Sequence, residues 1–480
     1  MFKKILIAVA IILAAIVTVL LVNTFRYKSK QLVMETIPTP AASQESIQHF
    51  QAAIRIPTIS YGDSSQIDTT QFLTFRHFLE TAYPLTHKNL MRETVARFTL
   101  LYRWEGKDQS LKPVIFMAHQ DVVPIEDATR GMWTANPFGG EIKDNFIWGR
   151  GTTDNKSNLV SIFEALEKMQ KGNFQPARTI YFMLGHDEEI GGKGAKAVAA
   201  LLKSRGVTAD LVMDEGGIIT TDKIPGMTRP VALLGTSEKG YLSLELVAEK
   251  NGGHSSQPET ETSIDILMKA ILAIRQNPFK TTVSESTQGL MDHLGPEMPF
   301  GAKMIFANQW LFQSLIIAQY EKSPGGNAMM RTTAVPTIID AGMKDNVVPT
   351  VATATVNFRL LPGDKSSEVI DRVKQLVNDD RIKIKVAHAF ISEASGVASE
   401  EGYGYQQVER IIRKTASDVI TAPFLMIGGT DSRHFEEVSS SIIKFSPMID
   451  PIGFHGIDER VSLESYALTI HFYEQMFRAL

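Results

Sequence analysis

Polar side chains of the types that bind metals follow three strand-like apolar runs of the chain. The runs are Val-Ile-Phe-Met-Ala, Ile-Tyr-Phe-Met-Leu and Leu-Val-Met. The side chains that follow them are, in chain order, His119 and Asp121, Glu188 and Glu189, and Asp214 and Glu215. In an open α/β sheet, ligands bind in the crevice beyond the carboxyl ends of the strands. We therefore expect these side chains to converge on one crevice.

Two further segments carry candidates for the same crevice. Asp154 lies in a Gly-rich loop, Gly-Arg-Gly-Thr-Thr-Asp-Asn-Lys, ahead of a predicted helix, and His455 lies late in the chain in Gly-Phe-His-Gly. The chain has no cysteine, which excludes disulfides, thiolate zinc sites and a cysteine nucleophile. Imidazoles and carboxylates without thiols suit zinc or a similar divalent ion, such as Co²⁺ or Mn²⁺.

The charges of these residues favour a pair of cations. A single Asp or Glu after a strand is usually a helix cap or a solvated loop charge, but here the carboxylates recur at successive strand ends. Their repulsion and desolvation in one cleft would be costly without compensating positive charge. Two Zn²⁺ ions with three ligating carboxylates leave one net positive charge, which a hydroxide neutralises. Water held by such ions ionises near neutral pH, so we expect metal-assisted hydrolysis.

The hydrophobic pattern predicts the elements that position these residues. Strand-length apolar runs alternate with helical patterns over residues 47–238, and short buried strands with a final helix return over 392–480. Between them, over 239–391, runs alternate with the two-residue period of a half-exposed sheet. The predicted fold class is α/β. A catalytic domain with a mostly parallel sheet and helices on both faces is interrupted by a smaller α+β lid or dimerisation domain.

The N-terminus is predicted to be a membrane anchor. The run Ile5–Val22 is apolar, basic residues flank it, and no small-residue cleavage pattern follows. We read residues 1–30 as an uncleaved single-pass anchor and 31–46 as a linker, with the catalytic domain extracytoplasmic. A cytoplasmic domain tethered to the inner face is the alternative. The net charge of −4 and the pI near 6.3 do not recommend a nucleic acid as partner.

The motifs resemble those of a known enzyme family. They are His-Gln-Asp-Val-Val-Pro, Gly-Arg-Gly-Thr-Thr-Asp-Asn-Lys, Gly-His-Asp-Glu-Glu-Ile-Gly-Gly, Met-Asp-Glu-Gly-Gly, Gly-Gly-His-Ser-Ser-Gln-Pro and Gly-Phe-His-Gly. In this order they resemble the dizinc metallopeptidases of the aminoacylase, glutamate carboxypeptidase and carboxypeptidase S type, from about Ile47 to the C-terminus. Val-Asn-Phe-Arg-Leu-Leu-Pro-Gly and the apolar N-terminus resemble most closely the branch that contains carboxypeptidase S and the N-fatty-acyl-amino-acid synthase/hydrolase.

The resemblance implies a role for each metal-site residue. Asp154 would bridge two Zn²⁺ ions, His119 and Asp214 would complete one site, and Glu189 and His455 the other.

The resemblance also implies the catalytic groups. Glu188 would be the general base, passing a proton from water to the leaving nitrogen. Asp121 would orient the imidazole of His119. His254, in the inserted domain, would donate to the oxyanion across a dimer interface.

The remaining expectations concern the substrate. Arg359 and Asn327 in the insertion, and Thr430 and Arg433 in the Gly-Gly-Thr-Asp-Ser-Arg turn, are expected to hold a substrate carboxylate, because a guanidinium matches its geometry. A structural salt bridge is the alternative for both arginines. The expected reaction is hydrolysis of the amide bond of an N-acyl-amino acid, or of the last peptide bond of a short peptide, with the reverse condensation open.

The sequence leaves two other functions open, and the role of one further segment. The alternative functions are a dimetal esterase or other hydrolase, and an inactive binding ectodomain of the same fold. The apolar segment Met291–Tyr320 either lines an acyl-chain site or packs the insertion, and we expect packing.

Overall fold

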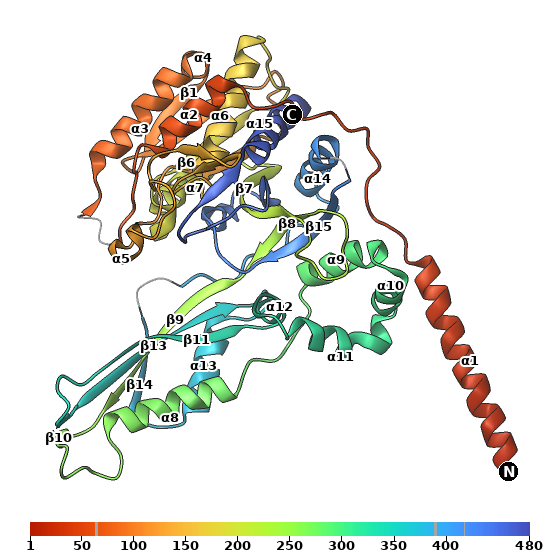
Figure 1. Ribbon diagram of the computed structural model, residues 1–480, viewed down its shortest axis with the longest axis vertical. Helices are drawn as coiled ribbons and strands as arrows, with labels where there is room; N and C mark the ends of the chain where they lie inside the picture. Colours follow the sequence, from red (N-terminus) through yellow and green to blue (C-terminus); the bar gives the residue numbers. More distant parts are fainter. Residues whose placement is uncertain (63–65, 388–390, 417) are drawn as a thin grey trace.

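The structure is a computed structural model that describes residues 1–62, 66–387, 391–416 and 418–480 (Figure 1). The chain forms a large α/β part and a smaller part built on a second sheet, with an N-terminal helix that projects from the body (Figure 1). The predicted insertion, 239–391, includes residues 388–390, which lie outside the described residues. Its boundaries, like those of the other predicted domains, stay predictions.

The large sheet positions the candidate site. It has eight strands in the order β1-β2-β6-β3-β7-β16-β8-β15. The central pairs β6–β3, β3–β7 and β7–β16 are parallel, as is β8–β15, whereas β1 and β2 form an antiparallel edge. The bounds are β1 (Met91–Val95), β2 (Thr99–Trp104), β3 (Val114–His119), β6 (Ile180–Gly185), β7 (Leu211–Thr220), β8 (Val231–Glu238), β15 (Ile420–Met426) and β16 (Ile442–Ile449). The mostly parallel sheet confirms the predicted α/β class.

Both faces of this sheet are covered by helices, which explains why its strands are continuous apolar runs. On β3, Phe116 belongs to the core shared with α6 and α15, and its neighbour Met117 belongs to the core shared with α7. The helices on the first face are α2 (Gln44–Ile54), α3 (Thr69–Ala82), α4 (Pro84–Asn89), α6 (Lys156–Lys171), α14 (Tyr403–Thr415) and α15 (Leu463–Ala479). On the second face lie α7 (Lys193–Ser204) and the 3-10 turn η4 (Asp431–Phe435).

The second sheet and its helices lie within the predicted insertion, and we call this part the lid. Its four strands follow the order β11-β13-β9-β14, and all its pairs are antiparallel. The bounds are β9 (Gly240–Glu249), β11 (Thr333–Ala341), β13 (Val351–Leu360), β14 (Ile382–Val386), α8 (Ser263–Gln276) and α13 (Ser366–Val377). One face of the sheet packs on α8 and α13, so buried and less buried residues alternate along β13.

The remaining elements of these two parts are short. The bounds are α5 (Asp127–Arg130), β4 (Glu141–Lys143), β5 (Phe146–Trp148), η2 (Glu188–Ile190), β10 (Gly253–His254), β12 (Val347–Val348) and β17 (Arg460–Ser462). β17, β5 and β4 form one small sheet, and β10 and β12 form another.

Four helices and a 3-10 turn lie between α8 and β11 in the chain. The bounds are α9 (Glu285–Leu294), η3 (Gly295–Glu297), α10 (Phe300–Ala307), α11 (Gln309–Tyr320) and α12 (Pro324–Met330). α9 packs on β15 of the large sheet, and α10 packs on α1 (Phe2–Arg26). α1 is long and apolar enough to cross a membrane, as both anchors and signal sequences are.

Candidate metal centre

Two of the expected segments come from the carboxyl ends of neighbouring strands, and the third, Asp214 with Glu215, lies within β7 just past the residues that pair with β3. His119 is the last residue of β3, and Glu188 and Glu189 form the turn η2 that follows β6. Asp154 lies in the loop before α6, and His455 lies in the loop before β17. The parallel strands bring these distant segments to the same edge of the sheet.

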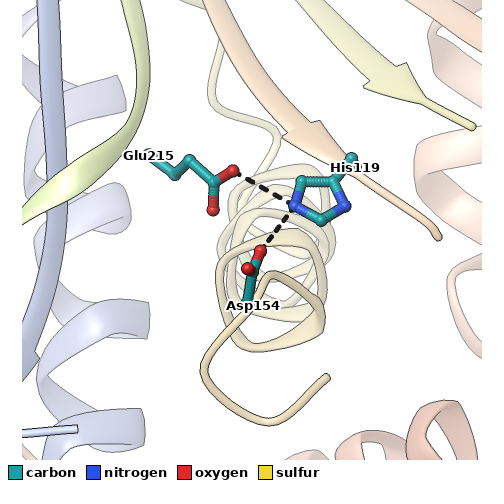
Figure 2. A group of neighbouring side chains, drawn as sticks. All are labelled: His119, Asp154 and Glu215. Carbon is teal, nitrogen blue, oxygen red and sulfur yellow. Dashed lines mark hydrogen bonds and ion pairs between the residues drawn. The ribbon is translucent and has the colours of Figure 1, made fainter. Parts of the chain in front are cut away.

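The first group consists of His119, Asp154 and Glu215 (Figure 2). His119 Nε2 lies 2.7 Å from Asp154 Oδ1 and 3.1 Å from Glu215 Oε1. The Asn155 side-chain amide donates to Glu215 Oε2, which fixes that carboxylate. Each residue offers one ligand atom toward a common point, and His119 and Asp154 are buried.

The second group shares Asp154 with the first. His455 Nε2 lies 2.7 Å from Asp154 Oδ2 and 3.2 Å from Glu189 Oε2. His455 has φ of 56°, a conformation that residues other than glycine rarely adopt. Arg150 Nη2 donates to the His455 carbonyl, at 3.3 Å, and holds this loop in place. The two oxygens of Asp154 thus face two different imidazoles, as a bridging ligand requires.

Asp121 orients the first imidazole and the turn that carries the glutamates. His119 Nδ1 lies 3.0 Å from the Asp121 carbonyl oxygen and 3.3 Å from Asp121 Oδ1. Ser60 Oγ donates to Asp121 Oδ2 at 2.6 Å, and the backbone N–H groups of Glu188 and Glu189 donate to the same carboxylate at 3.2 Å each. Because Nδ1 faces Asp121, Nε2 is left to face the site.

The electrostatics of the site call for additional positive charge. Burial, and then the charge of Asp154, raise the pKa of Glu189 to about 7 and that of Glu215 to about 8. Hydrogen bonds to Asp154 and Glu189 raise the pKa of His455 to about 10. Glu189 Oε1 is also buried with no hydrogen-bond partner among the described residues. The donor types, their convergence and this unpartnered oxygen fit divalent cations such as zinc.

Glu188 lies next to the ligand groups without belonging to either. Burial, and then the charge of Asp431, raise the pKa of its carboxyl well above the ordinary value. Arg433 Nη2 lies 4.0 Å from Glu188 Oε1. A carboxyl whose pKa is raised by burial is suited to accepting and returning a proton near neutral pH.

Glu215, and not the expected Asp214, lies with His119 and Asp154 in the first group. Asp214 Oδ2 accepts the Ser432 N–H at 2.9 Å, and Oδ1 accepts the N–H of Glu215. Successive side chains of a strand point to opposite sides, so only one of these two neighbours in β7 can face His119. Which of the two residues faces His119 depends on the orientation of the strand. The motif Met-Asp-Glu-Gly-Gly does not specify this orientation.

A buried carboxylate that the sequence analysis left without a role shapes the Asp154 loop. Glu459 Oε1 accepts from the backbone N–H groups of Gly151 and Thr153 at 3.0 and 2.8 Å, and Glu459 Oε2 pairs with Arg150 Nη1 at 2.7 Å. In the sequence, the only indication of this role is that Glu459 follows His455 by four residues.

Two of the expected substrate residues, Arg359 and Arg433, lie near each other. Arg359, on β13, is half-buried over the ring of Tyr241, 4.8 Å from its centroid. Burial, with the charge of Arg433 adding to it, lowers the pKa of Arg359. Asn327 lies in α12, the helix that precedes β11 in the chain. Arg433, from the large part of the molecule, therefore lies near the Glu188 carboxyl, and Arg359, from the smaller part, lies near Arg433.

Thr430 is engaged within the protein. Its N–H donates to Glu238 Oε2 at 2.8 Å, and its hydroxyl bonds to Glu238 and Ser432. Thr430 also caps the turn η4, which carries Arg433. These contacts place Thr430 in the support of the turn.

His254 lies outside both groups. It is exposed on β10, at the far end of the lid from the large sheet (Figure 1). The Ser256 N–H donates to His254 Nδ1 at 3.2 Å. Within one copy of the chain, His254 is not part of the metal centre.

The chain is similar to known proteins over most of its length. A model described as peptidase family M20/M25/M40 matches residues 115–479. The chain is 36% identical over 494 residues to probable carboxypeptidase S-like 2 of Dictyostelium discoideum, covering 99% of this chain and 94% of that protein. It is 37% identical over 480 residues to the N-fatty-acyl-amino acid synthase/hydrolase PM20D1 of Xenopus tropicalis, covering 97% and 93%. The M20 family metallo-carboxypeptidase Sso-CP2 from Sulfolobus solfataricus has the same fold, with a TM-score of 0.69 at 17% identity over 91% of this chain and 99% of that one.

Proposed function

The chain belongs to the peptidase family M20/M25/M40 and is therefore a hydrolase, and from this premise we propose that it is a dinuclear zinc enzyme that cleaves an amide bond next to a free carboxylate. The observation that carries the proposal is the pair of histidine–carboxylate groups that share Asp154. Co²⁺ or Mn²⁺ would suit the same donors.

Each group of side chains would hold one cation. His119, Asp154 and Glu215 form the first site, and Asp154, Glu189 and His455 form the second. When bound, the cations supply the positive charge that favours ionisation of a water molecule and polarises the substrate carbonyl. Asp121 keeps His119 in the orientation that exposes Nε2.

Glu188 is the proposed general base and acid. Its carboxyl is buried beside the metal ligands, and neither group of ligands includes it. It accepts the proton of the attacking water and returns it to the leaving nitrogen. The guanidinium of Arg433, 4.0 Å away, provides a positive charge beside the Glu188 carboxyl.

The substrate carboxylate is proposed to bind the guanidinium groups of Arg359 and Arg433, with Asn327 as a further polar contact. A guanidinium pairs with a carboxylate through parallel hydrogen bonds, which selects substrates with a free carboxylate at a fixed distance from the scissile bond. N-acyl-amino acids and short peptides both have this arrangement. The names of the two relatives, a carboxypeptidase and an N-fatty-acyl-amino acid synthase/hydrolase, support these substrate classes. The reverse condensation would use the same groups.

The membrane location of the enzyme is proposed from α1, and its dimerisation is proposed from the lid. α1 anchors the chain in a membrane, with the catalytic part on the extracytoplasmic side. A second copy of the chain binds through the lid, where the edge strand β11 exposes Val335, Ile338 and Ile339.

A substrate screen tests the proposal. The purified full chain, loaded with zinc, would be assayed against N-acyl-amino acids of varied acyl length, and against dipeptides whose C-terminal carboxylate is free or amidated. We expect hydrolysis of substrates with a free carboxylate, and its loss after chelation. Activity on phosphate or carboxylic esters with none on amides would favour a dimetal esterase or other hydrolase. Inactivity of the loaded protein on every substrate would favour an inactive binding ectodomain.

A further inference from the structure

α11 exposes an apolar surface although one of its faces already packs on the protein. The inward face includes Ile316 and Tyr320, which belong to a small apolar cluster with Met291 and Met330. On the outward face, Trp310, Leu311 and Leu315 are 62, 47 and 55% exposed. The 12 residues of α11 include no Asp, Glu, Lys or Arg. Gln313, Ser314 and Gln319 are also exposed, so α11 is uncharged on every side rather than apolar on every side. Exposed apolar surface of this kind marks a site of contact with protein or with a membrane.

This surface is attached to the end of α1. Asn308, at the junction of α10 and α11, is buried and donates to the Leu20 carbonyl at 3.1 Å, and the Asn23 side chain donates to Asn308 Oδ1 at 2.9 Å. The rings of Phe25 and Phe300 lie 6.0 Å apart. Polar groups that link two helices in this way are satisfied without water, as is necessary beside hydrocarbon.

The residues around the junction are typical of a lipid–water interface. Phe25, Phe300 and Trp310 are exposed aromatic side chains. Arg26, the last residue of α1, and Lys28, just past its end, are exposed basic ones. Aromatic rings are favoured at the headgroup level, and basic side chains pair with lipid phosphates. No acidic residue occurs in the sequence before Glu35.

We propose that α10 and α11 lie in the lipid–water interface beside α1, so that the enzyme contacts the bilayer through this hairpin as well as through its anchor. The apolar surface is continuous with the helix proposed to cross the membrane, because α10 packs on α1 and Asn308 joins α11 to it. The occupant is the acyl region of one leaflet. This inference rests on the proposed anchoring by α1 and is independent of the proposed hydrolase chemistry.

The absence of cysteine from the chain allows a direct test with single labels. The full chain would carry one cysteine, Leu311→Cys or Leu315→Cys, modified with a nitroxide and reconstituted in vesicles of phosphatidylcholine and phosphatidylglycerol. Collision of the label with oxygen, which dissolves in lipid, would be compared with collision with a water-soluble nickel chelate. The matched control is Leu73→Cys on α3, a leucine with 53% exposure that lies far from α1 in Figure 1. Ile12→Cys, in the middle of α1, reports on the anchor itself.

We expect labels at Leu311 and Leu315 to collide more with oxygen than with the nickel chelate, as the Ile12 label does, and the Leu73 label to show the reverse. A lipid-exposed label at Ile12 combined with water-exposed labels on α11 would overturn the inference and leave the anchor standing. A water-exposed label at Ile12 would overturn both. Labels on α11 that are shielded from both reagents would also overturn the inference, in favour of a protein partner. Unchanged urea unfolding midpoints would show that the labelled variants are folded.

Discussion

His119 Nε2 lies 3.1 Å from Glu215 Oε1, whereas the carboxylate of the adjacent Asp214 accepts backbone N–H groups of Glu215 and Ser432. The two carboxylates of one dipeptide therefore serve different purposes. Glu215 faces the metal centre, and Asp214 ties β7 to the turn η4, which carries Arg433.

The first prediction separates these two carboxylates by metal content. Glu215→Gln removes an anionic ligand from the site that His119 shares, so we expect the purified variant to hold about one zinc equivalent fewer than the parent. Asp214→Asn is the matched control, because it removes the same charge on the neighbouring residue, and we expect it to retain its zinc. Elemental analysis of the dialysed proteins measures both. Zinc loss in Asp214→Asn with full loading in Glu215→Gln would restore the assignment made from the sequence.

The second prediction concerns the proton transfer. Glu188→Gln keeps the size of the side chain and cannot accept a proton, so we expect kcat to fall by about 10²–10⁴-fold while the zinc content stays unchanged. Zinc content is the readout that separates loss of the base from loss of the metal. Turnover equal to that of the parent would remove Glu188 from the mechanism.

The third prediction tests the carboxylate clamp. Arg359→Ala removes a charged partner of the substrate, so we expect KM for N-acyl-amino acids to rise by about ten- to a hundredfold. Substrates whose carboxylate is amidated cannot use this contact, and we expect the parent and the variant to handle them alike. Tyr241→Phe is the control, because it keeps the ring beneath the guanidinium. An equal loss on free and amidated substrates would indicate a structural role for Arg359.

The features that depend on residue type and chain order could be predicted from the sequence. The strand end at His119 and the turn at Glu188 could be located because apolar runs precede them. The mostly parallel sheet could be predicted from the alternation of strands and helices. The choice between Asp214 and Glu215 could not be made, since it depends on which side of β7 faces the crevice. The pattern predicted packing for Met291–Tyr320, yet Trp310, Leu311 and Leu315 within it are exposed. Whether a helix face is buried depends on the structure around it, and the composition of the helix does not specify that structure.

The fourth prediction concerns stability at alkaline pH. Lys239 joins β8 to β9, and its Nζ donates to the carbonyls of Ala328 and Arg331 at 2.8 and 2.7 Å. Burial, with the charge of Arg359 adding to it, lowers the pKa of Lys239 to about 7, from 10.5 in an exposed lysine. Between these values the unfolded chain binds a proton that the folded chain has lost, so this group makes the free energy of unfolding increase as the pH rises from 7 to 10.5.

Lys239→Met removes this contribution. We expect the free energy of unfolding of the parent to increase relative to that of the variant as the pH rises from 7 to 10.5. Urea titrations of both proteins at several pH values measure the two free energies of unfolding. The contributions of the other titrating groups cancel in the difference between them. A difference that does not change with pH would show that Lys239 has an ordinary pKa in the folded protein.

The fifth prediction concerns His254, which lies at the tip of the lid, remote from the metal centre of its own chain. If two copies pair through the lid, His254 of one copy completes the site of the other and stabilises the oxyanion there. His254→Ala should then lower kcat by about 10²–10³-fold without changing the zinc content. Glu188→Gln should be equally inactive, for a different reason.

Mixing the two inactive proteins distinguishes action across a dimer from action within one chain. In a mixed dimer, the copy that carries His254→Ala retains its own Glu188 and receives an intact His254 from the copy that carries Glu188→Gln. One of the two sites is therefore complete. With random exchange of subunits, half of the dimers are mixed and each holds one working site, so we expect about a quarter of the parental activity to return. Each variant incubated alone is the control. No recovery, with subunit exchange demonstrated by differently tagged copies, would show that His254 does not act on the partner's site.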